Sequence, residues 1–360
     1  MVPGEDFAQD SHFLYERYLQ GQAFKPPGLF YKVKPLIPRG VQMAMRRALV
    51  RRAKLEFPAW PIEERLLKDW SGRVQRSLEA SGDDRLPFVN HWPDGKRFAV
   101  VLTHDVEGVE GVERIPEVIE VERRHGFVSS WNFVAEWYPF DRSIFEVIRA
   151  RGGEVGLHGI RHDGSLFRDR ATFEEQLPAI RRYLEDWGAL GFRSPSTIRN
   201  AEWMHELPCL YDSSFPQNDP YQPQPGGCCS PFPFFFGDVV ELPITLDQDH
   251  TLFEFLREDS IEIWIKKTEW LVESHGLVNL IVHPDYMTGG RLELYERFLE
   301  YLGGLVGDWH ALPAEVAQWW RARSAAGCTI RNGSPVMDGD LPGGTIAWAR
   351  PENGRLVYET

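Results

Sequence analysis

Short hydrophobic runs alternate with stretches of helical periodicity over most of the chain. Runs bounded by Gly, Pro or polar residues predict buried strands, and apolar residues three or four apart predict helices. The expected strands are Phe98–Thr103, Ser129–Ala135, Glu154–Leu157, Leu190–Phe192, Leu210–Tyr211, Val239–Pro243, Leu277–Val282 and Trp309–Leu312. The expected helices are Val112–His125, Arg142–Arg151, Thr172–Trp187 with Thr172 and Glu175 as a capping box, Ser260–Ser274 and Leu292–Leu305.

A repeated strand–helix alternation is typical of an α/β domain with a parallel sheet, here a closed or nearly closed (β/α) barrel of about seven strands. We expect residues 1–83 to form a basic arm and connector, 84–324 the barrel, and 325–360 a C-terminal extension. Asn353-Gly354 between two apolar segments predicts a hairpin in that extension. Pro216–Gly237, rich in Pro, Gly and Phe, is expected to be a long loop with packed or substrate-facing aromatic side chains.

Composition and charge narrow the class of protein. Of the 360 residues, 42% are hydrophobic and 26% charged, as in a globular protein with a sizeable core. A net charge of −13 argues against a nucleic-acid partner. We expect neither a membrane helix nor a signal peptide, because no apolar run approaches about 20 residues and acids interrupt Met1–Gln20. Together with four cysteines in no framework spacing, this predicts a cytoplasmic protein.

The charge is unevenly distributed along the chain. The segment Lys25–Lys54 contains nine basic residues and no acid. Within it, Val41–Lys54 has apolar residues at helical spacing with arginines around them. Such a helix can dock on an anionic membrane surface, or it can pack its apolar stripe on the main domain and leave the arginines in solvent. The sequence leaves both alternatives open.

Polar residues follow several of the expected strands directly. In a parallel barrel the carboxyl ends of the strands meet at one rim, where catalytic groups collect. Singly, each residue has an ordinary structural explanation, such as a helix cap, a salt bridge or a buried histidine. Independent explanations for all five strand ends are improbable, so we interpret them as one site. Its members are Asp105 and Glu107, His158 and His162, Arg193, Asp212, and His283.

These segments resemble the five ordered motifs of the polysaccharide deacetylases, carbohydrate esterase family 4, also known as the nodulation-factor deacetylase homology domain. The resemblance covers Phe98 to Leu312 and implies a distorted, incomplete (β/α) barrel. In Thr103-His-Asp105-Val-Glu107 the first aspartate is kept, while the second carboxylate lies one position later and is a glutamate. The family's tryptophan after the fourth motif is absent, with Phe215 nearby.

The resemblance implies a role for each residue of the predicted site. Glu107, His158 and His162 would bind a divalent metal, with zinc as the first choice and cobalt or nickel as alternatives. Asp105 would be the catalytic base, Arg193 would position it, and His283 would be the acid. Asp212 would orient that histidine. Two histidines four residues apart also fit one metal if a turn of helix joins them.

The predicted activity is removal of the N-acetyl group from an N-acetylated sugar in a polysaccharide, lipid-linked or other glycan precursor, with release of acetate. One alternative is a hydrolase of the same superfamily that acts on a small cyclic amide or ureide. Another is a catalytically silent protein that binds glycans or a membrane. A complete set of base, arginine, acid and orienting aspartate argues against the silent alternative, because a binding cleft does not need these groups together.

Overall fold

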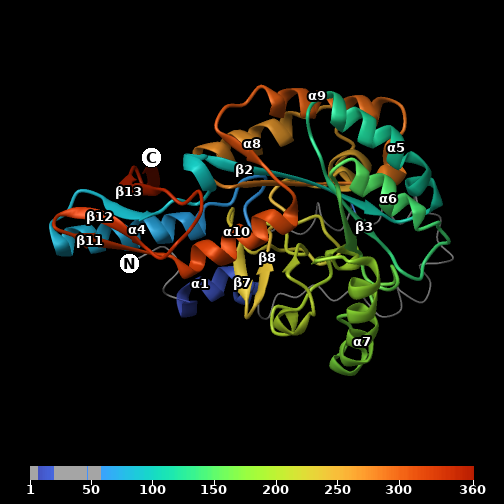
Figure 1. Ribbon diagram of the computed structural model, residues 1–360, viewed down its shortest axis with the longest axis horizontal. Helices are drawn as coiled ribbons and strands as arrows, with labels where there is room; N and C mark the ends of the chain where they lie inside the picture. Colours follow the sequence, from blue (N-terminus) through green and yellow to red (C-terminus); the bar gives the residue numbers. More distant parts are fainter. Residues whose placement is uncertain (1–6, 20–46, 48–57) are drawn as a thin grey trace.

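The computed structural model describes residues 7–19, Arg47 and residues 58–360 (Figure 1). Except for Arg47, the basic segment Lys25–Lys54 and its predicted helix Val41–Lys54 lie outside the described residues. The N-terminal part that is described contains helix α1 (Phe7–Leu14) and the 3-10 turn η1 (Arg17–Leu19). Helix α1 is joined to the rest of the molecule by Asp10, which accepts a hydrogen bond from Trp70 and pairs with Arg73.

A nine-stranded sheet forms the centre of the molecule, in the order β10-β2-β3-β4-β5-β6-β8-β7, with β9 on β2. All nine residues of β2 are buried, which explains why its first five, Phe98–Leu102, are all apolar. Within the described chain no pairing joins β7 to β9 or β10, so the barrel is incomplete. The strands are β2 (Phe98–Val106), β3 (Ser130–Phe133), β4 (Glu154–Leu157), β5 (Gly191–Phe192), β6 (Tyr211–Asp212), β7 (Phe234–Phe236), β8 (Val239–Glu241), β9 (Leu277–Val282) and β10 (Asp308–His310).

Each of the eight predicted strands is confirmed, and their pairings with one another are parallel. The ninth strand, β7, runs antiparallel to β8 and was not predicted, because Phe234–Phe236 lies in the segment expected to be a loop. The expectation that aromatic side chains of this segment are packed is confirmed for three of them. Phe232, Phe234 and Phe236 are buried in the core, and Phe232 stacks on His91 with ring centres 4.3 Å apart. Their rings therefore contribute to packing.

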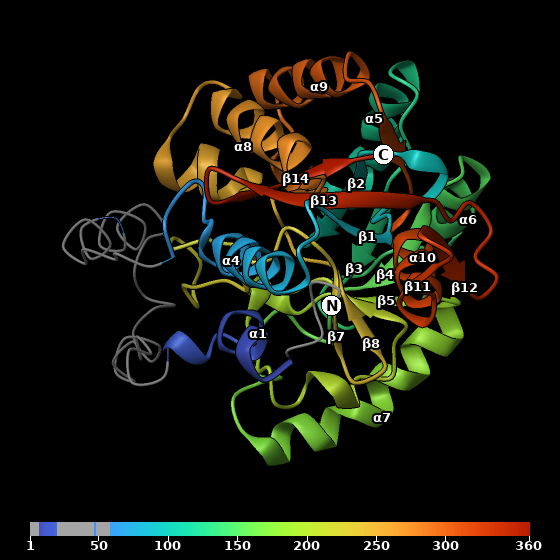
Figure 2. The ribbon, with the colours of Figure 1, turned by 90° about the vertical axis from the view of Figure 1, so that its left-hand side faces the viewer.

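Helices cover the outer face of the sheet (Figures 1 and 2). The helix α7 begins at Arg170, and Asp169 caps it by accepting the Thr172 N–H. The predicted capping box of Thr172 and Glu175 is therefore wrong, because the helix starts two residues earlier. The helices around the barrel are α5 (Val109–Arg124), α6 (Ser143–Ala150), α7 (Arg170–Trp187), α8 (Glu262–Glu273), α9 (Gly290–Gly303) and α10 (Pro313–Ala325). Short turns are η3 (Pro93–Gly95), η4 (Pro195–Thr197), η5 (Met204–Glu206), the π-helix η6 (His250–Leu256) and η7 (Pro284–Tyr286).

A second, smaller sheet lies beside helix α4 (Arg65–Ser81), at the left of Figure 1. Its order is β1-β13-β14, formed by β1 (Leu86–Val89), β13 (Ile346–Glu352) and β14 (Arg355–Glu359). The predicted C-terminal hairpin is confirmed, and both turn residues, Asn353 and Gly354, have positive φ. Because β1 pairs with β13, the C-terminal extension shares a sheet with the segment that leads into the barrel. A separate hairpin joins β11 (Gly327–Arg331) and β12 (Ser334–Asp338).

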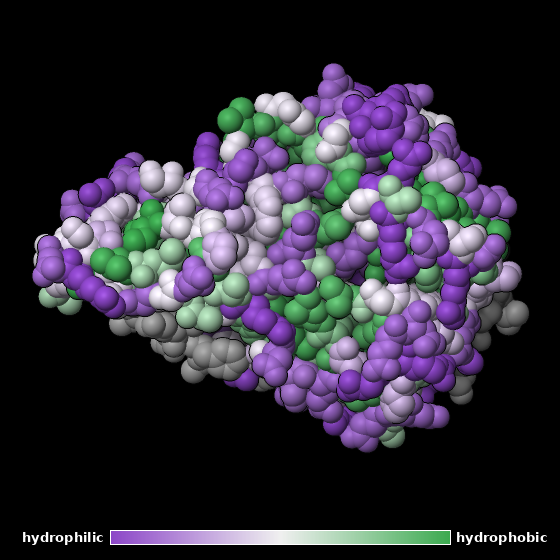
Figure 3. All heavy atoms as spheres, viewed as in Figure 1, coloured by the Kyte–Doolittle hydropathy of each residue, from purple (hydrophilic) through white to green (hydrophobic). Residues whose placement is uncertain are grey.

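Hydrophilic side chains cover most of the face shown in Figure 3, with small hydrophobic patches between them. None of the helices within the described ranges has the length and apolar character needed to cross a membrane.

Candidate active site

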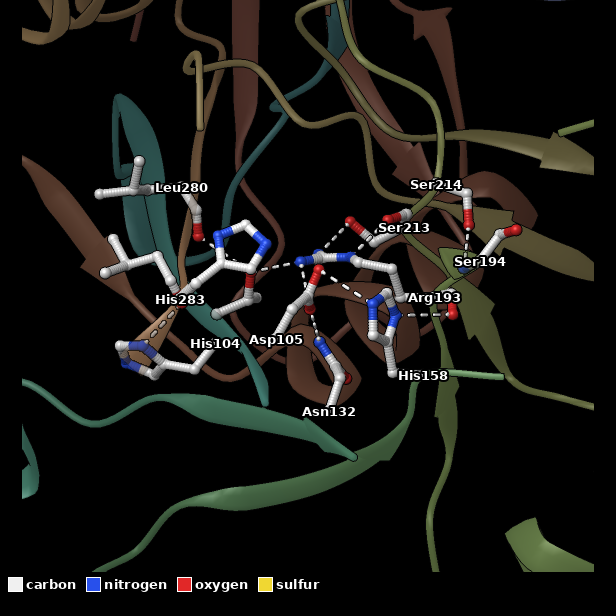
Figure 4. A network of polar contacts seen from close by, with 12 residues as sticks. His104, Asp105, Asn132, His158, Arg193, Ser194, Ser213, Ser214, Leu280 and His283 are labelled. Atoms are coloured by element: carbon white, nitrogen blue, oxygen red, sulfur yellow. Dashed lines mark hydrogen bonds and ion pairs between the residues drawn. The ribbon is translucent and has the colours of Figure 1, made fainter. Parts of the chain in front are cut away.

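Polar side chains from four strand ends converge at one rim of the barrel (Figure 4). Asp105 lies near the end of β2, His158 and Arg193 directly follow β4 and β5, and His283 directly follows β9. None of these four residues is more than 4% exposed. Parallel strands bring their carboxyl ends to the same edge, which is why residues far apart in sequence meet here.

Three side chains on this rim form a group that fits a metal ion. One ligand atom from each of Glu107, His158 and His162 lies within 4.8 Å of the other two. The Nδ1 of His158 lies 3.1 Å from the Arg193 carbonyl oxygen, a contact that leaves Nε2 directed into the site. The Nε2 atoms of both histidines are buried, and the described groups that they contact are carboxylates: Glu107 for both, and Asp105 for His158. Two imidazole nitrogens and a carboxylate are a donor set that suits zinc and similar divalent metals.

Charge complementarity holds this group together. Glu107 Oε1 lies 2.9 Å from His162 Nε2, 3.7 Å from His158 Nε2 and 3.6 Å from His283 Nε2. Burial opposes ionisation of Glu107, but the contacts with the three histidines outweigh it and hold the pKa of Glu107 well below its usual value. Burial lowers the pKa of His162 less than the Glu107 carboxylate raises it, so the net shift is upward.

The two histidines do not share a helical turn as the spacing suggested. Residues from His158 to His162 form a loop after β4, in which Gly159 has φ +68°. A Cβ atom at Gly159 would lie 2.7 Å from the ring of Pro195, so glycine is needed there both for φ and for space. The loop brings the imidazole rings to a centre distance of 5.4 Å.

One carboxylate oxygen of Asp105 is held by hydrogen bonds. The other is directed toward the group formed by Glu107, His158 and His162. Its Oδ1 accepts hydrogen bonds from Arg193 Nη1 at 3.1 Å and Asn132 Nδ2 at 3.0 Å. Its Oδ2 lies 3.8 Å from His158 Nε2. Arg193 is fixed in turn by donating to the carbonyl and hydroxyl oxygens of Ser213. Burial opposes ionisation of Asp105, but Arg193 and His158 outweigh it and lower the pKa of Asp105.

Asp249 orients His283. Its Oδ1 lies 2.6 Å from His283 Nδ1, and its Oδ2 accepts the His283 backbone N–H at 2.9 Å. Burial lowers the pKa of His283, but the Asp249 carboxylate outweighs it, and the pKa of His283 is raised well above its usual value. His283 Nε2 faces Glu107, so the imidazolium is directed into the site.

The prediction that Asp212 orients His283 is wrong. Successive side chains of a strand point to opposite faces. The side chain of Ser213 accepts a hydrogen bond from Arg193, so that of the preceding residue, Asp212, points away from the site. Asp212 instead bonds Ser214 and lies beside Glu241, its register partner on β8. Burial, together with the neighbouring Asp212, raises the pKa of Glu241 well above its usual value.

Sequence reasoning also missed two residues that support the site. Asn132 is the one amide within the strand Ser130–Phe133, and a polar residue inside a buried run is a signal for an inward-facing contact. Asp249 lies three residues beyond the segment Leu242–Leu246, and Asp247 is the acid that directly follows that segment. The strand β8 itself ends at Glu241, so Asp249 is too far from a strand end for the rule that located Asp105 to select it.

The fold is similar to those of two solved structures. One, from Mycobacterium smegmatis, is named as a polysaccharide deacetylase; it is 19% identical with a TM-score of 0.51, and the match covers 68% of this chain and 98% of that one. The other is the Puue allantoinase, 18% identical with a TM-score of 0.50, where the match covers 64% of this chain and 93% of that one. At these identities the likeness concerns the fold.

Neither a protein-family model nor a curated protein sequence matches the chain. The predicted fold class, a distorted and incomplete (β/α) barrel, is confirmed, and so is the resemblance to polysaccharide deacetylases at the level of the fold.

Proposed function

We propose that this protein is a metal-dependent hydrolase that removes the N-acetyl group of an N-acetylated sugar and releases acetate. One observation carries the proposal. A group that suits a divalent metal lies between a carboxylate paired with an arginine, Asp105, and a histidine paired with a carboxylate, His283. Hydrolysis of an unactivated amide needs a base for water and an acid for the leaving amine, and this arrangement supplies both.

Glu107, His158 and His162 would hold the metal, with zinc as the first choice and cobalt or nickel as alternatives. When bound, such an ion polarises the amide carbonyl and makes a neighbouring water more acidic. His158 suits the role of ligand because the contact of its Nδ1 with the Arg193 carbonyl favours the tautomer whose Nε2 lone pair is free.

Asp105 would take the proton of the attacking water. Arg193 and Asn132 keep its Oδ1 engaged, so Oδ2 is the oxygen available for the proton. His283 would give a proton from Nε2 to the departing amine nitrogen. Asp249 supports that step because it stabilises the charged imidazole and fixes its orientation.

The sugar needs an apolar face to bind against, and Trp137 is the candidate. Its side chain is 50% exposed, and its ring centre lies 6.4 Å from that of the proposed ligand His162. The backbone around it is tied to the loop of the ligands by hydrogen bonds from Ala135 N–H to Gly159 and from Glu136 N–H to Ile160. A half-exposed indole on a fixed backbone can stack on a pyranose ring at low entropic cost.

Metal analysis of the purified protein and an assay for acetate tests the proposal. We expect about one equivalent of a divalent metal, acetate release from at least one member of a panel of N-acetylated sugars and their oligomers, and loss of that activity after chelation. A protein that retains no metal and releases no acetate from any of them would contradict it.

A second candidate function is hydrolysis of a small cyclic amide or ureide. The similarity of the fold to an allantoinase favours it. The two candidates differ in their product, because opening a ring leaves both parts in one molecule while deacetylation releases acetate. Mass spectrometry of the products from allantoin and from N-acetylglucosamine oligomers therefore separates them.

Docking of Lys25–Lys54 on an anionic membrane surface stays a prediction, as does a cytoplasmic location. Arg47, the one described residue of that segment, donates hydrogen bonds to the carbonyls of Phe255 at 2.7 Å and Glu254 at 3.0 Å, which favours the alternative of a structural brace. Co-sedimentation with neutral and anionic liposomes at low and high salt decides between them. Membrane docking requires selective binding to anionic vesicles that salt reverses.

A further inference from the structure

The proposed metal ligand Glu107 lies just beyond the end of β2, where the sheet no longer fixes its backbone. Two hydrogen bonds position this backbone in place of strand pairing. Tyr138 donates its hydroxyl hydrogen to the carbonyl of Val106, and the backbone N–H of Glu107 donates to Asp285 Oδ2 at 3.0 Å. The second contact comes from η7, the turn that directly follows His283. One short segment thus carries the proposed acid and a tether for a proposed ligand.

The start of helix α5 is shaped around the Asp285 carboxylate. The N-cap residue of this helix is Gly108, which provides no side-chain cap. A Cβ atom at Gly108 would lie 2.9 Å from Asp285 Oδ1, and one at Gly111 would lie 2.4 Å from Oδ2. Glycine is unfavourable inside a helix, so its presence at position 111 has a local reason: it leaves room for this side chain.

We infer that Asp285 is a positioning residue that sets the backbone of Glu107 so that its carboxylate reaches His158 and His162. This inference rests on the proposed function, since it assigns Glu107 to a metal. Glu107 has one more side-chain carbon–carbon bond to order than an aspartate would have, and a fixed backbone reduces what must be ordered when a metal binds. Residues that hold a ligand in place typically change metal affinity 10- to 100-fold when they are removed.

Four variants test the inference. Asp285→Ala removes the tether, and Asp285→Asn keeps an acceptor oxygen of similar size. Gly111→Ala places a methyl group where the carboxylate lies, and the double variant Gly111→Ala/Asp285→Ala has the methyl group without the clash. Glu117→Gln, an exposed acid on the same helix, is the matched control. Zn²⁺ affinity is measured by calorimetry with the metal alone, and the melting temperature is measured on metal-free protein.

We expect Asp285→Ala and Gly111→Ala each to weaken Zn²⁺ binding about 10- to 100-fold, while Asp285→Asn and Glu117→Gln stay near the native affinity. In the double variant the effects should not add, and its metal-free melting temperature should exceed that of Asp285→Ala, because alanine favours the helix once the clash is gone. Unchanged Zn²⁺ affinity in Asp285→Ala, or fully additive losses in the double variant, would overturn the inference.

A crystal structure of metal-free Asp285→Ala tests the positioning role of Asp285 separately from the proposed metal-dependent function. The inference expects the Glu107 carboxylate to move away from His162, and a Glu107 that stays within 0.5 Å of its native position would refute it. That comparison holds whether or not the native protein binds metal. Failure of the native protein to retain any metal would instead remove the proposed function.

Discussion

The Asp249 carboxylate contacts His283 twice, once at the ring and once at the backbone, with Oδ1 lying 2.6 Å from Nδ1 and Oδ2 accepting the N–H at 2.9 Å. The double contact fixes both the ring orientation and the start of the turn η7. It also leaves Nε2 as the ring nitrogen that faces Glu107. The residue that follows Asp249 begins the π-helix η6, so the carboxylate sits on an ordered element.

Asp249→Asn should therefore lower kcat by about 10² to 10⁴, the range of a general acid that loses its charged partner. In the proposed mechanism the active form of His283 is the protonated one, and Asp249 raises the pKa of that histidine. Activity falls as pH rises through this pKa, so the fall should occur at lower pH in the variant. Asp212→Asn is the matched control, because Asp212 faces Glu241, and a comparable loss in that variant would restore the original assignment. The loss in kcat and the shift in the pH at which activity falls are both measured from pH–rate profiles of acetate release.

The variant His158→Ala/His162→Ala should lose its metal and its activity while the fold survives. Both imidazoles supply a buried Nε2 that lies beside the Glu107 carboxylate, so their removal takes away two of three proposed ligands. Metal content by mass spectrometry and the circular dichroism spectrum are the measurements. His205→Ala, with a side chain that is 54% exposed, is the control. Native metal content in the double variant would show that the site is misassigned.

Asp105→Asn should keep the metal and lose about 10² to 10⁴ in rate, as expected for a general base. An asparagine can still accept from Arg193, so the local structure should be retained. Metal content and single-turnover rates test the two parts separately. If the variant loses its metal, Asp105 is a ligand, and the roles of Asp105 and Glu107 have to be exchanged.

Trp137→Ala should raise KM for N-acetylated oligosaccharides about five- to tenfold with little change in kcat, since stacking on an aromatic ring contributes about 1 kcal/mol. Trp137→Phe keeps a ring and should lose less. Steady-state kinetics with sugar substrates provide the test. An unchanged KM in the alanine variant would exclude stacking of the sugar on this indole.

Glu154, the first residue of β4, lies at the opposite end of the barrel strands and makes the stability of the fold depend on pH. Burial raises the pKa of its carboxyl from 4.5 to about 7, although Tyr211 and the Ala314 N–H bond it. The folded state therefore loses stability as pH rises from the unfolded value toward 7, by at most about 3 kcal/mol because the side chain is partly exposed. Glu154→Gln should reduce the fall in melting temperature between pH 5 and pH 8. An identical fall in the native protein and in Glu154→Gln would show that a group other than Glu154 causes it.

Much of the barrel could be predicted because its strands are buried on both faces. Leu277–Val282 is apolar except for Asn279 for that reason, and the residue that directly follows it, His283, reaches the rim. The same logic located Asp105, His158 and Arg193. The strand Phe234–Phe236 escaped prediction because Pro and Gly around it are typical of loops, and only its pairing with β8 makes it a strand.

The sequence by itself determined which residues end the strands, and therefore which chemistry gathers at the rim, because burial of a strand forces an apolar run and makes its polar end visible. Only the tertiary structure decided which carboxylate serves which partner. Asp212 and Asp249 are equally plausible partners of His283 along the chain. The side-chain alternation of β6 sends Asp212 to Glu241, while the turn after β8 brings Asp249 to the histidine. Such pairing depends on the face of each strand and the path of each loop, which local sequence patterns do not encode.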